Sequence, residues 1–294
     1  FSPLAERTVE VAAGLRRRLD KGLWLRLLRG GRMFKELNEA LPVVQRVLAL
    51  VEAAEASDGE AITIVDLCSG IGYLSILLAE LLRGSSKVAR FVLVDSRWPM
   101  LNAEAQPHHI NPMHLQGGLW PFELAYRKYD LKSSSGQRQL QEHIVAHAPG
   151  PVALLGVHLC GVLSLHAVQF FNDHPRCTFL ALKPCCLPPW TLARQEFVWT
   201  LGGHTIPAAD VCAPGTYVRS RWTGPQRKSA QGAVFRRWAS HLLDAIDAGE
   251  LGRKELADFE LVRVPEGQEP RYQTLFAFAE RAYGACAGAV RGIG

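Results

Sequence analysis

The sequence predicts an α/β protein built on a mostly parallel β-sheet with helices on both faces. Three observations lead to this fold class. Short, continuously apolar segments recur along the chain, segments with helical spacing separate them, and several of the apolar segments end in an acidic residue. Uninterrupted apolar strands are typical of parallel sheets, because helices cover both faces of such a sheet. The 294 residues allow one large domain with additions, or two domains.

The composition is that of a globular protein, with 48% hydrophobic and 21% charged residues. The longest apolar segment, 73–82, is interrupted by Glu80 and falls well short of the ~18 residues that a membrane helix needs, so we expect no membrane segment. Seven cysteines without a CxxC spacing do not fit a disulfide-rich secreted scaffold. We therefore expect an intracellular protein in a reducing compartment, with the cytoplasm favoured over an organelle or the nucleus.

The positive charge is concentrated in two parts of the chain. The net charge is +5, but residues 1–35 and 219–243 each carry +6, so that the remainder is acidic. Two basic segments on an acidic body are typical of a protein that binds a polyanion, and they also fit two solvated faces of a protein that does not.

The first 56 residues are predicted to form a basic helical extension. Leucines recur at every fourth position from Leu15 to Leu27, which predicts a helix over 8–29 that ends at Gly30-Gly31. A second helix is expected over 33–53, with a kink or break at Pro42. Residues 57–294 then form the α/β domain, with an inserted basic substrate loop at about 188–240.

The α/β domain is expected to contain seven strands. The first five are predicted at 61–66, 90–95, 122–130, 152–157 and 178–182, and the last two at 259–264 and 274–279. Helices are predicted at 73–82, 163–171 and 233–246. Residues 107–121 are irregular, and 190–231 have little periodicity and many Pro, Gly and Arg residues, which indicates a loop.

A glycine-rich turn after the first predicted strand carries the strongest chemical signal. Gly70 and Gly72 let a ligand approach the backbone closely. Asp66 ends the strand before the turn, and Asp95 ends the next strand, where a carboxylate can accept both hydroxyls of a ribose. The dinucleotide fingerprint G-x-G-x-x-G is incomplete because position 75 is Ser. An acid just before the turn favours a cationic ligand instead.

The segment Val65-Asp-Leu-Cys-Ser-Gly-Ile-Gly72 resembles motif I of the class I S-adenosylmethionine-dependent methyltransferases. The resemblance implies a Rossmann-like methyltransferase domain, with S-adenosyl-L-methionine as cofactor and S-adenosyl-L-homocysteine as product. In that family the acid at 66 faces the methionyl amino group, the acid at 95 holds the ribose, and the acid at 130 contacts the adenine. The cofactor-binding residues that follow are Asp66, Cys68, Ser69, Gly70, Gly72, Tyr73, Asp95, Ser96, Asp130, Leu131 and His158.

Two further elements follow the fourth and fifth predicted strands. They read Gly-Val-His-Leu-Cys-Gly at 156–161 and Leu-Lys-Pro-Cys-Cys-Leu at 182–187. Together with the turn they resemble a subgroup that includes the eukaryotic tRNA acceptor-stem 2′-O-methyltransferases and related methyltransferase-like proteins. The resemblance covers roughly 61–187, and 256–281 fit more loosely. The sequence has no counterpart of the zinc-binding modules that precede the catalytic domain of those tRNA enzymes, so substrate recognition is expected to come from elsewhere.

The catalytic candidates in these two elements are His158, Lys183, Cys185 and Cys186. His158 or Lys183 would assist methyl transfer to a ribose hydroxyl as a base or a cation beside the acceptor. Cys185 or Cys186 would instead attack a pyrimidine ring. Zinc binding by His158, Cys160, Cys185 and Cys186 is conceivable, but adjacent cysteines fit poorly around one tetrahedral ion, and we expect no metal. The plainest interpretation makes Cys160 and Cys185 small buried packing residues.

The basic segments predict RNA as a partner. Arginines alternate with aromatic rings in 219–238, so that phosphates would be paired by guanidinium groups and unpaired bases stacked on rings such as Phe235 and Trp238. Burial of these two rings in the core is the alternative. The RNA-binding residues expected are Arg16, Arg17, Arg18, Arg219, Arg221, Arg227, Lys228, Arg236 and Arg237. We expect the N-terminal helices to pack on the α/β domain, with a surface for a protein partner or a membrane as the alternative, and we expect no membrane partner.

These observations together predict a methyltransferase that modifies RNA, either tRNA or rRNA, with a ribose 2′-oxygen as the favoured acceptor. Two alternatives stay open. One is a methyltransferase of proteins or small molecules. The other is a catalytically inactive RNA-binding or assembly factor that retains the cofactor pocket. The sequence does not indicate an oligomeric state.

Overall fold

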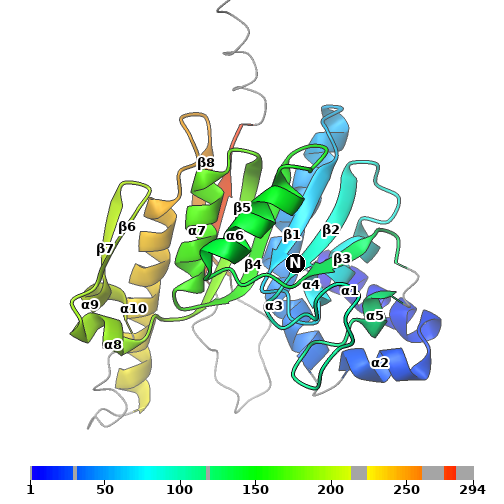
Figure 1. Ribbon diagram of the computed structural model, residues 1–294, viewed down its shortest axis with the longest axis horizontal. Coiled ribbons are helices and arrows are strands. Elements are labelled where there is room, and N and C mark those ends of the chain that lie inside the picture. Colours follow the sequence, from blue (N-terminus) through cyan, green and yellow to red (C-terminus); the bar gives the residue numbers. More distant parts are fainter. Residues whose placement is uncertain (1, 29–31, 117–119, 213–223, 260–274, 283–294) are drawn as a thin grey trace, which may run out of the picture. The chain divides into compact units, whose positions relative to one another are not determined.

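The computed structural model describes residues 2–28, 32–116, 120–212, 224–259 and 275–282. It divides into two compact units, Phe1–Leu155 and Gly156–Gly294. Seven strands pair in the order β3-β2-β1-β4-β5-β9-β8, and a two-stranded sheet pairs β6 with β7. Strand β4 (Val152–Cys160) begins in the first unit and ends in the second (Figure 1).

The first unit holds the N-terminal helices and the first strands. Its elements are α1 (Ser2–Arg18), α2 (Lys21–Leu28), α3 (Arg32–Ala56), β1 (Ile62–Leu67), α4 (Tyr73–Leu81), β2 (Val88–Val94), α5 (Met113–Gln116), β3 (Leu124–Arg127) and α6 (Ser134–Leu140), which continues as a π-helical turn over Gln141–Val145. Strand β1 lies parallel to β2 and to β4, and β2 lies parallel to β3. All six residues of β1 are buried, as expected of a central strand whose side chains are covered on both faces.

The second unit continues the sheet with antiparallel pairs. Its elements after β4 are α7 (Leu163–Asp173), β5 (Cys177–Cys186), α8 (Trp190–Arg194), β6 (Val198–Leu201), β7 (His204–Pro207), α9 (Ala208–Val211), α10 (Gly224–Ala245), β8 (Arg253–Asp258) and β9 (Leu275–Glu280). Strand β9 lies between β5 and β8 and is antiparallel to both. Arg281, directly after β9, donates a hydrogen bond to the carbonyl oxygen of Phe171 at 2.8 Å and stacks on its ring.

The predicted fold class is confirmed: an α/β fold on a mostly parallel seven-stranded sheet, preceded by helices. In the first unit, the N-terminal helices pack through their apolar residues, because Leu15, Trp24 and Leu27 are all buried. None of the described helices has both the length and the apolar character that crossing a bilayer requires.

The opening segment differs from the prediction, because two helices replace one. Asp20 ends the first helix: its Oδ1 accepts hydrogen bonds from the backbone N–H groups of Gly22 at 2.7 Å and Leu23 at 3.1 Å. This side chain therefore caps the start of α2. The break expected at Pro42 is absent, since α3 runs unbroken through it. Pro42 is buried within the apolar face of α3, and packing of that face offsets the lost backbone hydrogen bond.

Two predicted strands and one predicted loop differ from the structure. The third strand is shorter than predicted, and the fifth is longer, since β5 extends through Cys186. The expected loop over 190–231 contains α8, the β6–β7 hairpin, α9 and the start of α10 in its described part. The strand predicted at 259–264 lies almost entirely outside the described residues, and β8 comes before it.

Candidate cofactor and acceptor sites

The glycine-rich turn after β1 has a left-handed backbone at three positions. Cys68, Gly70 and Gly72 have φ values of 56°, 54° and 89°. At Gly72 a Cβ atom would collide with the side chain of Leu93, whereas at Gly70 it would meet nothing within 4 Å. Gly72 is therefore required by packing against β2, and the space beside Gly70 is open to a ligand.

Asp95 is joined directly to this turn. Its Oδ2 accepts a hydrogen bond from the Gly70 backbone N–H at 3.1 Å, and its Oδ1 accepts one from the Arg97 N–H at 2.8 Å. The side chain is half-buried, so part of the carboxylate remains open to a ligand, and Ser96 beside it is exposed. The structure thus brings together two features that the sequence predicts for one cofactor site, the glycine turn and the acid at the end of the second strand.

Asp66 lies deeper than its neighbours. It is 3% exposed, and its Oδ2 accepts a hydrogen bond from the Ser75 hydroxyl on α4 at 2.8 Å. Burial raises the pKa of Asp66 to about 7, and the nearby charge of Asp95 adds to the rise, while the hydrogen bond from Ser75 opposes it. The carboxyl group is therefore held near the midpoint of its titration at neutral pH.

The remaining cofactor candidates of the first unit lie around the turn and beyond β3. Tyr73 starts α4 and donates its hydroxyl proton to the Leu27 carbonyl at 2.6 Å. Asp130 is exposed, and its Oδ1 accepts a hydrogen bond from the Lys132 N–H at 3.0 Å, while Leu131 is buried. Because β3 neighbours β2, Asp130 follows the strand next to the one that Asp95 ends. The predicted roles of these residues stay predictions.

Two aromatic side chains support the turn, and the sequence analysis missed both. Trp98 is fully buried and donates from Nε1 to the Ser69 hydroxyl at 3.2 Å. His114 is buried, which lowers the pKa of its imidazole. The neutral ring lies 2.7 Å from the Ile71 carbonyl, and since a carbonyl only accepts, Nε2 carries the proton. Neither residue belongs to a motif, and His114 lies in a segment whose sequence shows no periodicity.

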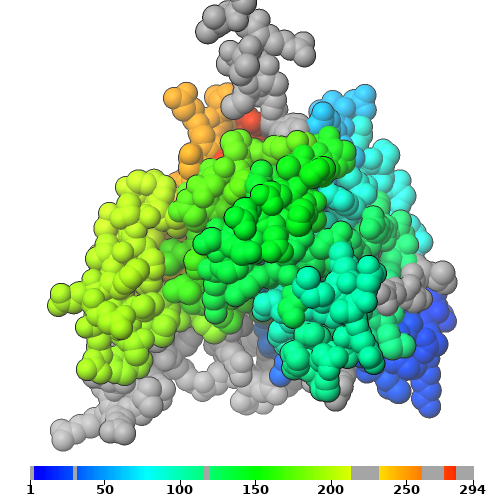
Figure 2. Space-filling model, in the orientation of Figure 1, coloured from blue at the N-terminus to red at the C-terminus, as the bar shows by residue number. Residues whose placement is uncertain are grey.

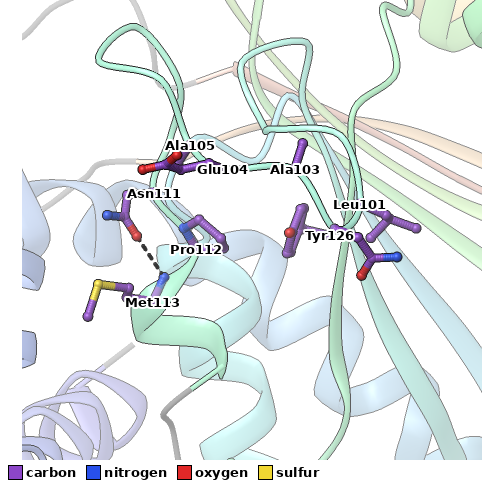
Figure 3. A pocket seen from close by; sticks show the side chains of 9 residues that line it. Leu101, Ala103, Glu104, Ala105, Asn111, Pro112, Met113 and Tyr126 are labelled. Carbon is purple, nitrogen blue, oxygen red and sulfur yellow. Dashed lines mark hydrogen bonds between the residues drawn. The ribbon is translucent and has the colours of Figure 1, made fainter.

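The segment between β2 and β3 lines a pocket of about 410 Å³ in the first unit (Figure 3). Its walls include Leu101, Glu104, Met113 and Tyr126, and the Met113 N–H donates to Asn111 Oδ1 at 3.0 Å. This segment belongs to the face drawn in Figure 2, where it is turquoise. None of the predicted cofactor residues lines the pocket.

The catalytic candidates all belong to the second unit. His158 is half-buried on β4, and Lys183 on β5 is fully buried, with its ammonium group 5.7 Å from the centre of the Phe276 ring. Cys160 and Cys186 are exposed and Cys185 is partly buried, so the expectation that Cys160 is a buried packing residue is wrong. This expectation fails because the three cysteines lie at the ends of β4 and β5.

The three thiols perturb one another. Hydrogen bonding to Cys160 and Cys186 raises the pKa of Cys185 far above its usual range. Hydrogen bonds from Cys160 and Cys185 hold the pKa of Cys186 well below its usual range, and the charge of His158 contributes to the same direction. Of these two adjacent thiols, Cys186 is therefore the more acidic.

The predicted RNA-binding residues are only partly described. Arg16, Arg17 and Arg18 are exposed at the end of α1, where Arg18 pairs with Glu80 at 2.7 Å. Arg236 and Arg237 are exposed on α10, where Arg236 pairs with Asp258 at 2.7 Å. The other predicted contacts lie outside the described part of the chain or, within α10, have side chains that are not described: Arg219, Arg221, Arg227 and Lys228.

The base-stacking expectation is wrong for two of the rings. Phe235 and Trp238 are 4% and 0% exposed, because both face the core of the second unit from α10. Phe235 and Trp238 therefore serve packing, whereas Arg236 and Arg237 face solvent.

Comparison with known proteins identifies the class. Residues 32–188 match the family model described as a methyltransferase domain. This match covers more than half of the chain, and the protein belongs to that family. The chain thus contains a methyltransferase domain of the class I fold, for which the cofactor is S-adenosylmethionine, as the sequence predicts.

Several solved structures are similar to this chain in fold. The plantazolicin methyltransferase BpumL in complex with S-adenosylhomocysteine is 11% identical, with 96% of this chain and 98% of that chain covered and a TM-score of 0.39. The S-adenosylmethionine-dependent methyltransferase from Agrobacterium tumefaciens is 10% identical, with coverages of 83% and 62% and a TM-score of 0.39.

Monomeric WbdD is 11% identical to this chain, with 81% of this chain covered and a TM-score of 0.35. The chain spans only 41% of the length of WbdD. No protein in the curated sequence set matches the chain.

Proposed function

We propose that the protein methylates RNA and that the acceptor is a ribose 2′-hydroxyl. The observation that carries the proposal is the row of exposed arginines, Arg16, Arg17 and Arg18, that ends α1 in the unit holding the cofactor residues. Guanidinium groups pair with phosphates in a bidentate manner, and three consecutive arginines at the end of a helix concentrate positive charge that attracts a nucleic acid backbone. Arg236 and Arg237 provide a second exposed pair in the other unit.

The residues around the glycine turn fit S-adenosylmethionine. The open space beside Gly70 lets the cofactor approach the backbone, and the half-buried carboxylate of Asp95 is available to the ribose hydroxyls. The exposed carboxylate of Asp130 would lie at the adenine. When bound, the cofactor supplies a methyl group on a positively charged sulfur. The acidic side chains Asp66 and Asp95 favour that charge over the neutral product.

The acceptor hydroxyl must lose a proton when it is methylated. Among the candidates, His158 is half-buried, with its Nε2 atom buried, whereas Lys183 is fully buried beside Phe276. We assign the base to His158 and a positioning role to Lys183. In this assignment His158→Ala lowers kcat.

The proposal is tested by transfer of a tritiated methyl group from S-adenosylmethionine to total RNA, compared with protein extract and small molecules. We expect nuclease-sensitive label, at a nucleotide that resists alkaline cleavage because its 2′-oxygen is methylated. Label in protein or in a small molecule would refute the RNA assignment. Cofactor binding without any transfer, together with RNA binding, would instead identify a non-catalytic RNA-binding factor.

A pair of charge reversals tests the arginine row directly. Arg16→Glu on α1 should weaken RNA binding and make the remaining affinity less sensitive to salt, because the loss of a phosphate contact means that fewer counterions are released on binding. Arg253 is exposed on β8 and is not part of the row, so Arg253→Glu changes the total charge equally. Equal effects of the two variants would show that only net charge matters and would count against a contact at α1.

A further inference from the structure

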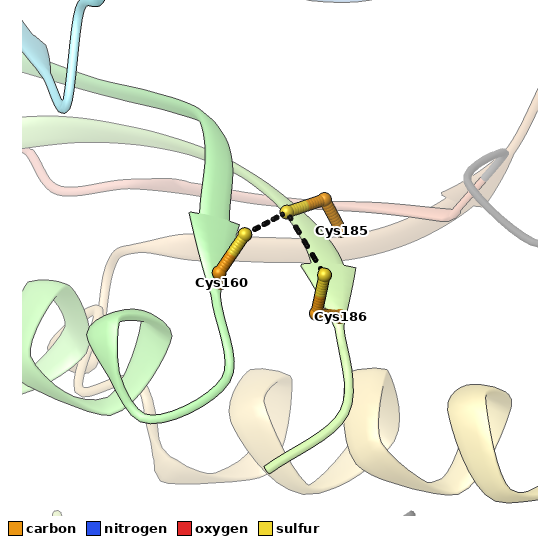
Figure 4. A group of neighbouring side chains, drawn as sticks. All are labelled: Cys160, Cys185 and Cys186. Carbon is orange, nitrogen blue, oxygen red and sulfur yellow. Dashed lines mark hydrogen bonds between the residues drawn. The ribbon is translucent and has the colours of Figure 1, made fainter. Parts of the chain in front are cut away.

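The ends of β4 and β5 bring three cysteine side chains together. Cys160 is the last residue of β4, and Cys185 and Cys186 are the last residues of β5. The Sγ atoms of Cys160 and Cys185 are 2.8 Å apart, those of Cys185 and Cys186 are 3.8 Å apart, and all three lie within 4.8 Å of one another. Figure 4 shows the three side chains pointing toward one another from the two strand ends.

Neither packing nor ordinary strand geometry explains this convergence. Cys160 and Cys186 are exposed, so they do not fill the core, and thiols form only weak hydrogen bonds. Consecutive residues of a strand point to opposite faces, yet the sulfur atoms of Cys185 and Cys186 approach the same point. The backbone fixes the two strand ends relative to each other: Gly161, with a φ of 55°, donates its N–H to the Cys186 carbonyl at 3.1 Å.

We propose that Cys160, Cys185 and Cys186 bind a zinc ion through their three thiolates. Sulfur is a soft ligand that suits Zn²⁺, and Zn–S bonds of about 2.3 Å in a tetrahedron place sulfur atoms about 3.8 Å apart. The Cys185–Cys186 distance of 3.8 Å already meets this value. The Cys160–Cys185 distance must grow by about 1 Å, which rotation of the exposed Cys160 side chain allows.

The site would hold its ion at the surface of the second unit. Binding releases the thiol protons to solvent, so that zinc affinity rises with pH. Because Cys160 and Cys186 are exposed, water can reach the fourth tetrahedral position. Three protein ligands with an exchangeable fourth position are typical of zinc sites at which water or a substrate atom binds.

The test uses the full chain, kept fully reduced and free of chelator. We expect about one zinc ion per chain by elemental mass spectrometry, and a tetrahedral thiolate absorption spectrum after replacement with Co²⁺. Each of the variants Cys160→Ser, Cys185→Ser and Cys186→Ser should lower zinc affinity at least tenfold in competition with a chromophoric chelator. Circular dichroism and thermal unfolding establish that each variant is folded.

Cys212→Ala is the matched control, because Cys212 is a buried free thiol of the same unit that does not belong to the group. It should retain wild-type zinc affinity. The proposal fails if folded, reduced wild-type protein takes up no zinc, or if the variant lacking all three thiols binds zinc as tightly as the wild type. It also fails if the chain is isolated with two fewer titratable thiols and, once reduced, binds no metal.

Discussion

Asp66→Asn should make the stability of the protein less dependent on pH. In the folded protein the pKa of Asp66 is about 7, against 3.8 for an ordinary aspartate, because the carboxyl group is buried. Between these two values the unfolded chain releases a proton that the folded chain keeps. Ionisation therefore favours the unfolded state, and stability falls as the pH rises from about 4 through 7. Asparagine removes the ionisation and still accepts the hydrogen bond from Ser75.

The magnitude follows from the two pKa values. For a single group that titrates at about 7 when folded and at 3.8 when unfolded, the free energy of unfolding drops by about 2.5 kcal/mol between pH 5 and pH 8. The difference in stability between Asp66→Asn and wild type should grow in favour of the variant by about this amount. Urea unfolding at pH 5, 6, 7 and 8, followed by circular dichroism, measures this difference directly.

A second variant should make the stability of the protein more dependent on pH. Ser75→Ala removes the hydrogen bond that lowers the pKa of Asp66, so the loss of stability with rising pH should become larger than in the wild type. If the pH profiles of wild type and Asp66→Asn run parallel from pH 5 to 8, the carboxyl group does not titrate as its burial requires. The account of its environment would then be wrong.

The other predictions concern the turn and its neighbours. Asp95→Ala should weaken cofactor binding at least tenfold in calorimetry while leaving the fold largely intact, and unchanged affinity would contradict the ribose assignment. Gly72→Ala should lower the melting temperature more than Gly84→Ala does. Both glycines have a φ near 90°, but of these two positions a Cβ atom collides with Leu93 at Gly72 and meets nothing within 4 Å at Gly84. Equal costs would show that Leu93 simply moves aside.

Much of the first unit could be predicted from local patterns. Strand β1, the turn and α4 follow one another within about 20 residues, and each is signalled by its own residues: an apolar run, Gly70 and Gly72, then helical spacing. The break between α1 and α2 was missed although its cause is also local, since Asp20 is a capping residue at the point where α2 begins. The spacing of the leucines alone does not reveal a capping residue.

The candidate site was less predictable, because its chemistry depends on contacts between distant residues. The sequence predicts that Asp66 ends a strand. It does not predict the hydrogen bond from Ser75 or the burial that raises the pKa of Asp66. The sequence also does not predict that Cys160 and Cys185 lie close together. They do so because β4 and β5 are neighbours in the sheet. The burial of Phe235 and Trp238 depends likewise on which face of α10 meets the core.

The order of strands has a consequence for synthesis on the ribosome. Strand β9 is the last strand described along the chain, yet it occupies a position between β5 and β8. While the chain is being made, β5 is translated about 90 residues before its partner, and its edge has no strand to pair with until β9 leaves the exit tunnel. A nascent chain with such an edge is open to aggregation, so this half of the protein should depend on chaperones until β9 has been translated.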